Sequence, residues 1–175
     1  MTVLPMRFFG DPVLRSVADP VSFPVSGDPS SLSQDATLAT LVADMLETMD
    51  HYGGVGLAAN QVGVTRRVFV YDCEGDRGHV INPEWEPVGD EVQVGPEGCL
   101  SIPGIRGDVQ RAETVVVRGV TLDGTPVERQ VSGLLARCVQ HETDHLNGVM
   151  FLKHLSKDDR RAAMAQIRQA EWFNN

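Results

Sequence analysis

The stretch 134–146, LLARCVQHETDHL, decides the fold because it combines a helical pattern with a metal-binding motif. It is predicted to form a helix that ends at the Asn-Gly pair 147–148, since glycine commonly terminates helices. His141 and His145 lie four residues apart, so both imidazoles project from one face and can bind the same metal ion. Glu142 lies beside that face, where its carboxylate can act as a base on metal-bound water. The sequence therefore predicts a catalytic metal site on a central helix.

The third metal ligand does not follow the two histidines. In metzincin proteases the motif continues with a glycine and then a third histidine, but here Phe151 stands at the position of that ligand. A thermolysin-like site needs a downstream glutamate on a following helix, and Glu171 is the only glutamate after Glu142. Neither protease pattern is complete, so we expect the third ligand to lie upstream.

Cys99, within the sequence EGCLS at 97–101, is the best upstream candidate for that ligand. We expect it on a loop between glycine- and proline-rich turns at 95–96 and 103–104, where little side-chain bulk blocks a close approach. Two imidazoles and one thiolate leave a fourth tetrahedral position for water, which is typical of catalytic sites. Taken alone, a single cysteine is more often a small buried apolar residue, and we interpret Cys73 and Cys138 in that way.

A third segment, GVGLAANQ at 54–61, is rich in small residues. We interpret it as a helix end followed by a tight loop, in which the paired glycines let another backbone come close. Gln61 supplies a neutral amide donor there. The segment lacks the G-x-G-x-x-G pattern and no strand is predicted before it, so a dinucleotide is not expected.

Composition narrows the class of protein. The chain has 175 residues, of which 42% are hydrophobic and 22% charged, as in an ordinary globular domain. Its formal charge of −9 argues against a protein that coats nucleic acid. The first ten residues show no signal-peptide pattern, the apolar stretches are short, and three cysteines are too few for a disulfide framework. We therefore expect a soluble cytoplasmic protein with no membrane partner and no direct nucleic-acid specificity.

The wider pattern predicts an α+β fold in a single domain over residues 1–175. An N-terminal helix is expected between an N-cap at Asp35 and a stop at Gly53, and a C-terminal helix after a cap at Ser156. Mixed or antiparallel sheets would pack around the central helix that carries the H-E-x-x-H motif. An Asp-Gly turn at 123–124 indicates a β-hairpin. Strands are expected at 68–71, 79–82, 91–94, 114–122 and 127–131.

Three ordered motifs together resemble the peptide deformylase family. That family is recognised by G-φ-G-φ-A-A-x-Q, E-G-C-φ-S and H-E-x-D-H, where φ is apolar, and the chain matches them at 54–61, 97–101 and 141–145. The run GDPVL at 10–14 is also similar to the family's N-terminal arm. The resemblance implies a hydrolase of translation and N-terminal protein processing. It would remove the formyl group from the N-terminal formylmethionine of newly synthesised polypeptides and release formate.

The resemblance also implies a role for each residue of the site. Cys99 and the two histidines would hold one divalent metal ion per chain, with water in the fourth position. Metal-bound hydroxide would attack the formyl carbon, with Glu142 as general base and then general acid. The Gln61 amide and the Leu100 backbone N–H would hold the developing oxyanion. The family's usual metal is Fe²⁺, and Zn²⁺, Ni²⁺ or Co²⁺ can substitute for it.

A substrate pocket is expected beside the metal. Its members on the central helix lie three, four and seven residues before His141 and share its face. Arg137 would line the pocket with its alkyl stem and keep its guanidinium in water. The backbone at 54–56 would pair with an extended peptide as an added strand. The predicted substrate-binding residues are Gly54, Val55, Gly56, Leu134, Arg137 and Cys138.

Several charged residues have weaker predictions. Glu97 and Asp144, both within the motifs, lie near the predicted centre, and Arg111 is expected to pair with one of them and orient the site, while a solvated surface role fits each equally well. The C-terminal helix carries a basic set that the resemblance would assign to ribosome contact, but Asp158 and Asp159 dilute its charge and a solvated face is the preferred interpretation. Its members are Lys157, Arg160, Arg161 and Arg168.

Other functions stay open from the sequence. A metallopeptidase would share the H-E-x-x-H motif but would need another ligand than Phe151 supplies. A catalytically silent, deformylase-like binding module would keep the fold, but it predicts loss of Glu142, Gln61 or a ligand, and all are present. A structural metal site would normally need a fourth protein ligand.

Overall fold

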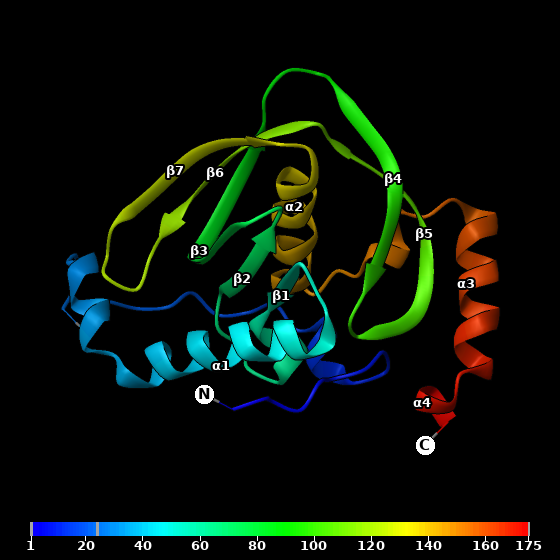
Figure 1. The fold of residues 1–175 in the computed structure, drawn as a ribbon, viewed down its shortest axis with the longest axis horizontal. Helices are drawn as coiled ribbons and strands as arrows, with labels where there is room; N and C mark the ends of the chain where they lie inside the picture. Colours follow the sequence, from blue (N-terminus) through cyan, green and yellow to red (C-terminus); the bar gives the residue numbers. More distant parts are fainter. Residues whose placement is uncertain (1, 24, 175) are drawn as a thin grey trace.

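The computed structural model describes residues 2–23 and 25–174, so residues 1, 24 and 175 of the predicted domain lie outside the described part. Helix α2 (Gly133–Leu146) stands in the middle of the fold, between a five-stranded sheet and the long β4–β5 hairpin (Figure 1). Helix α1 (Ala36–Tyr52) packs on β1 and β2, and α3 (Lys157–Gln169) lies outside β5. The prediction of an α+β fold around the motif-bearing helix is confirmed.

Every pair of neighbouring strands is antiparallel. The larger sheet has the order β1-β2-β3-β6-β7, and the smaller one consists of β4 and β5. All five predicted strands are present; four are longer than predicted or shifted, and the strand predicted at 114–122 ends at Val120. The bounds are β1 Gly56–Ala58, β2 Val68–Cys73, β3 Asp76–Pro87, β4 Val92–Cys99, β5 Ile102–Ala112, β6 Thr114–Val120 and β7 Pro126–Ser132.

The predicted helix ends are confirmed by their hydrogen bonds. The Asp35 side chain accepts from the backbone N–H of Leu38 at 2.9 Å, and Gly53 ends α1 with a φ of 68°, a conformation that favours glycine. Ser156 caps α3 by accepting from the N–H of Asp159 at 3.1 Å. Shorter helices were not predicted: η1 Pro12–Arg15, η2 Pro29–Gln34, η3 Ala59–Val62, η4 Phe151–His154 and α4 Glu171–Asn174.

Two segments that were expected to be loops are strands. Strand β4 runs on to Cys99 and β5 starts at Ile102, so the expected loop at 97–101 is a hairpin end. The prolines that suggested turns, Pro96 and Pro103, lie in strands with only one neighbour, where a missing N–H is tolerated. The expected loop after residue 56 is also partly wrong, because β1 pairs with β2 before η3 begins. Both corrections place site residues on regular, hydrogen-bonded backbone.

The core has three parts that together enclose α2. One face of the larger sheet packs on α1, and the other face packs on α2 through residues such as Phe69 and Val139. A third cluster joins β5, η4 and α3 around Phe151. As a result, even polar residues of α2 such as Gln140 are buried. Among the described residues, no helix is long and apolar enough to cross a membrane.

Candidate metal centre and substrate pocket

Three side chains from two elements converge on one point. Cys99 ends β4, while His141 and His145 lie one turn apart on α2. The Nε2 atom of His145 is 3.2 Å from the Cys99 Sγ and 3.2 Å from the His141 Nε2. The three ligand atoms all lie within 4.8 Å of one another. Ligands of a tetrahedral ion at ordinary bond lengths are about 3.3–3.6 Å apart, so this donor set fits a divalent metal.

The buried carboxylate of Glu97 orients His141. It accepts from the His141 Nδ1 at 2.9 Å, from Nε and Nη2 of Arg111 at 2.8 and 3.0 Å, and from Nη1 of Arg137 at 2.8 Å. Burial alone would raise the pKa of Glu97, but the bonds from His141 and Arg111 outweigh it and hold the pKa well below its usual range. With Nδ1–H donated to Glu97, the Nε2 lone pair of His141 faces the other ligands and is available to a metal.

Arg111 joins two carboxylates rather than the one expected. Besides Glu97, its Nη1 donates to the Oδ2 of Asp144 at 2.6 Å, and His154 Nε2 lies 2.8 Å from the same oxygen. Asp144 sits on α2 between the two histidines. The pairing therefore ties the motif-bearing helix to β5.

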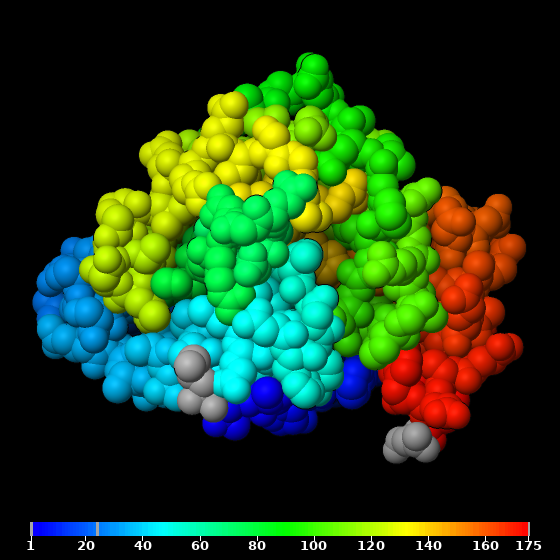
Figure 2. All heavy atoms as spheres, in the orientation of Figure 1, coloured from blue at the N-terminus to red at the C-terminus, as the bar shows by residue number. Residues whose placement is uncertain are grey.

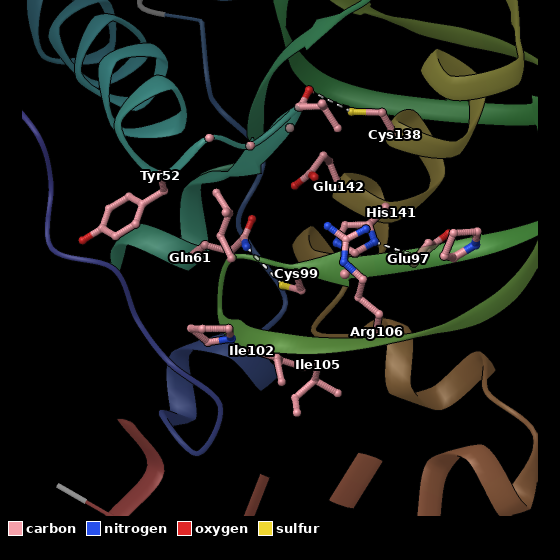
Figure 3. Close-up of a pocket in the computed structure, with 18 of the residues that line it drawn as sticks. Tyr52, Gln61, Glu97, Cys99, Ile102, Ile105, Arg106, Cys138, His141 and Glu142 are labelled. Atoms are coloured by element: carbon pink, nitrogen blue, oxygen red, sulfur yellow. Dashed lines mark hydrogen bonds and ion pairs between the residues drawn. The ribbon is translucent and has the colours of Figure 1, made fainter. Parts of the chain in front are cut away.

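Glu142 faces the pocket from α2 (Figure 3). Its side chain is buried, and its Oε2 has no hydrogen-bond partner among the described residues. Burial raises the pKa of Glu142 to about 7 in the metal-free protein. Gly56 leaves the room that this carboxylate needs, because a Cβ there would lie 2.5 Å from Glu142 Oε1. The free oxygen of this carboxylate therefore lines the same cavity as the candidate metal ligands Cys99 and His141.

The amide of Gln61 is held with its NH₂ group towards Cys99. Its Oε1 accepts from the backbone N–H of Ala58 at 2.8 Å, which fixes which end is the donor. Nε2 then lies 3.2 Å from Ser101 Oγ and 3.4 Å from Cys99 Sγ. Leu100 occupies the turn directly after Cys99 and lines the same pocket as Gln61. Gln61 and Leu100 therefore both border the metal centre.

A cavity of about 690 Å³ opens beside the metal ligands, which is enough for a short peptide segment. Figure 2 shows this hollow between the segments around residues 50–60, 95–105 and 134–142. Tyr52, Val55 and Leu134 are exposed at its walls. All six predicted substrate-binding residues line it: Gly54, Val55, Gly56, Leu134, Arg137 and Cys138.

The carbonyl of Val55 is anchored by three donors. The N–H of Asp72 donates to it at 2.9 Å, and the thiols of Cys73 and Cys138 each lie 3.6 Å from it. Cys138 thus lines the cavity and lies outside the candidate metal cluster of Cys99, His141 and His145. This anchoring keeps the start of β1 in a fixed position beside Glu142.

The prediction that Arg137 keeps its guanidinium in water is wrong. The group turns inward, where Nε donates to Gln93 Oε1 at 3.2 Å and Nη1 donates to Glu97 at 2.8 Å and to the Val109 carbonyl at 3.0 Å. Gln93, Gly95 and Glu97 alternate along β4 and so share the strand face that α2 covers. The ionised carboxylate of Glu97 on that face pairs with the guanidinium. This pairing stabilises the inward conformation relative to the predicted one, in which the guanidinium extends into water.

Several residues of the site were missed. Asn60 donates from Nδ2 to the backbone carbonyl of His145, and Ser101 accepts from Gln61. Both lie within the motifs at 54–61 and 97–101, and their short polar side chains there were the available signal. The remaining walls of the cavity come from β5 and the end of α1, among them Tyr52, Ile102, Ile105 and Arg106 (Figure 3).

Comparison with known proteins adds an independent line of evidence. A sequence profile of the polypeptide deformylase family matches residues 3–161. Peptide deformylase 1 of Corynebacterium efficiens is 56% identical over 178 aligned positions, which cover 99% of each chain. A solved peptide deformylase from Legionella pneumophila superposes with a TM-score of 0.84 at 38% identity, covering 96% of this chain and 95% of that one. The Synechococcus elongatus peptide deformylase, solved in complex with actinonin, gives 0.83 at 37% identity over 95% and 86%.

Proposed function

The chain belongs to the polypeptide deformylase family, and on that premise we propose which of its residues carry out the reaction. It is a hydrolase that removes the formyl group from N-terminal formylmethionine of new polypeptides. Glu142, Gln61 and Leu100 are the proposed catalytic groups, and Cys99, His141 and His145 the proposed metal ligands. The convergence of the three ligand atoms beside the unpartnered Glu142 carboxylate carries this assignment.

A divalent ion held by the three ligands supplies a Lewis acid that lowers the pKa of water and polarises the formyl oxygen. We propose Fe²⁺ as the ion used in the cell, with Zn²⁺, Ni²⁺ or Co²⁺ as substitutes, since imidazole and thiolate donors suit all four. Elemental analysis of protein purified without oxygen from cells grown in unsupplemented medium tests this. A preparation in which zinc alone reaches one ion per chain would contradict it.

Glu142 is the proposed general base and acid. It accepts the proton of the attacking water through its free oxygen and then delivers a proton to the leaving amine. Because Glu142 is buried, neither step competes with bulk solvent for the proton.

Gln61 and the backbone N–H of Leu100 are the proposed donors to the developing oxyanion. The amide orientation set by Ala58 supports this role for Gln61, because its Nε2 donors face the ligand Cys99 before substrate arrives. Such preorganised donors stabilise charge without reorganising during the reaction.

The substrate backbone is proposed to pair with the segment 54–56. Strand β1 ends the larger sheet, so its outer edge has no strand partner among the described residues. An extended peptide can add there as a further strand, which recognises main chain and tolerates many sequences. The methionine side chain would then enter the cavity beside Leu134 and Cys138.

Contact with the ribosome through α3 and action in the cytoplasm are also proposed, because the substrates are nascent chains. The basic residues of α3 are exposed, although Arg161 pairs with Asp158 at 3.5 Å. Co-sedimentation with ribosomes tests the contact. Reversing the charge of Arg160 and Arg168 should weaken it, and equal sedimentation of that variant would contradict the proposal.

The first experiment measures formate release from formyl-Met-Ala-Ser by the wild type and by Glu142→Ala, both loaded with metal without oxygen. Loss of a general base lowers kcat by about 10²–10⁴-fold. Equal metal content in both proteins is the control. Peptide-bond cleavage within the substrate would favour a metallopeptidase, and intact substrate with the metal-loaded wild type would favour the silent binding module.

A further inference from the structure

Some of the N–H donors of the Arg137 guanidinium have no hydrogen-bond acceptor among the described residues. Of its five N–H donors, the one on Nε and the two on Nη1 face Gln93, Glu97 and the Val109 carbonyl. Because these bonds come from different elements, they hold the planar head in one orientation. No described residue accepts a hydrogen bond from Nη2, so its two N–H groups remain available.

Nη2 is also reachable. The Arg137 side chain as a whole is only 10% exposed. Nη2 nevertheless keeps some exposure, since it has no hydrogen-bond partner and is not one of the fully buried atoms that lack one. Arg137 lines the substrate cavity together with Leu134 and Cys138. Nη2 lies over Gly95, where a Cβ would be in ordinary contact with it at 3.5 Å. Arg137 therefore adds a charged donor to the wall of a cavity that Arg106 also lines.

We propose that Nη2 of Arg137 donates a hydrogen bond to the side chain that fills this pocket, and that peptides beginning with formylmethionine sulfoxide are therefore substrates too. The inference rests on the proposed function, since it assigns the cavity to the first side chain of the formyl-peptide. It adds a class of substrate and names the residue that admits it.

The chemistry of three similar side chains shows what such a donor selects. Methionine offers a weak thioether acceptor, its sulfoxide offers a strong oxygen acceptor, and norleucine, of similar length and shape, offers none. An apolar pocket rejects a sulfoxide because burying an unpaired polar group is unfavourable. A guanidinium with free N–H groups makes the pocket prefer the sulfoxide to norleucine. It donates a hydrogen bond to the sulfoxide oxygen, whereas its N–H groups stay unpaired when norleucine fills the pocket.

The experiment compares kcat/KM for formate release from three peptides, formyl-X-Ala-Ser with X as methionine, methionine sulfoxide or norleucine. The measured quantity is the sulfoxide-to-norleucine ratio, which does not depend on the fraction of active enzyme. We expect the wild type to cleave the sulfoxide peptide within about tenfold of the methionine peptide, since one hydrogen bond is worth roughly that factor. Arg137→Leu should lower the ratio by tenfold or more.

A ratio that changes less than tenfold in Arg137→Leu overturns the inference, as does a wild type that releases no formate from the sulfoxide peptide. Arg137→Lys replaces the leucine variant if the latter fails to fold, because lysine keeps the charge beside Glu97 but loses Nη2. Val92→Ala is the control: Val92 is an exposed residue of β4 that does not line the cavity, so its variant should leave the ratio unchanged. No formate from the methionine peptide would instead overturn the proposed function and this inference with it.

Discussion

Gly56 is predicted to matter for catalysis more than for folding. Its backbone is not in the left-handed region, so alanine meets no conformational strain there. The added Cβ would instead lie 2.5 Å from Glu142 Oε1 and 2.6 Å from Cys138 Sγ. Both neighbours are side-chain atoms, so the fold can accommodate Gly56→Ala by moving them.

The size of that movement sets the expected loss. Ordinary contact with a Cβ begins near 3.4 Å, so the Glu142 oxygen has to retreat by about 0.9 Å. A displacement of about 1 Å in a catalytic group lowers the rate by roughly 10²-fold. Overpacking a buried site costs about 1–3 kcal/mol of stability. We therefore expect kcat to fall by about two orders of magnitude in a protein that still folds and binds metal.

Formate release under saturating substrate measures the effect, and urea unfolding with metal analysis shows that the variant is intact. Gly98→Ala is the matched control, because it lies next to Cys99 but its Cβ would have no neighbour closer than 3.5 Å. We expect its kcat to stay close to that of the wild type. A folded, metal-loaded Gly56→Ala enzyme with wild-type kcat would refute the steric argument.

Three other perturbations test the site and the fold. Glu97→Gln leaves two buried arginines facing a neutral amide, so the free energy of unfolding should fall by about 3–5 kcal/mol in urea titrations; an unchanged midpoint would contradict the ion-pair network. Removing the metal with a chelator should lower Tm and make Cys99 the first cysteine alkylated, as mass spectrometry can show, because the other two are buried. Asp35→Ala should cost about 1 kcal/mol at pH 7. The N–H of Leu38 and Arg66 lower the pKa of Asp35 below 3.8, so this difference is full above that pH and should vanish as pH falls through the lower folded value.

The sequence predicts best what depends on neighbouring residues. The caps at Asp35 and Ser156 and the stop at Gly53 are local signals, and the structure has each of them. Strand β1 escaped prediction because three residues are too few for a strand pattern to be visible. The β4–β5 hairpin escaped because its prolines indicate turns unless the strand is known to be an edge.

In the site, too, the residues set by local sequence were predicted and the contacts set by the tertiary fold were not. The helix period places His141 and His145 on one face, and the ligand chemistry points to Cys99 before any fold is known. The partners of those ligands, by contrast, depend on which strand covers which helix. Glu97 was recognised only as a nearby carboxylate, since its bonds to Arg111 and Arg137 bridge 14 and 40 residues of sequence.

Gly95 and Arg137 show why such contacts resist prediction one residue at a time. A glycine within a strand is unfavourable because it gives up side-chain packing, and an arginine on a buried helix face is unfavourable because its charge must be paired. In the structure the guanidinium lies over Gly95, where only a small side chain has room, and Glu97 on the same strand face neutralises it. The two positions are 42 residues apart, so neither is interpretable without the other. Side chains larger than alanine at Gly95 are therefore expected to act through the polarity of the pocket, because their atoms beyond Cβ would displace the Arg137 head rather than the strand.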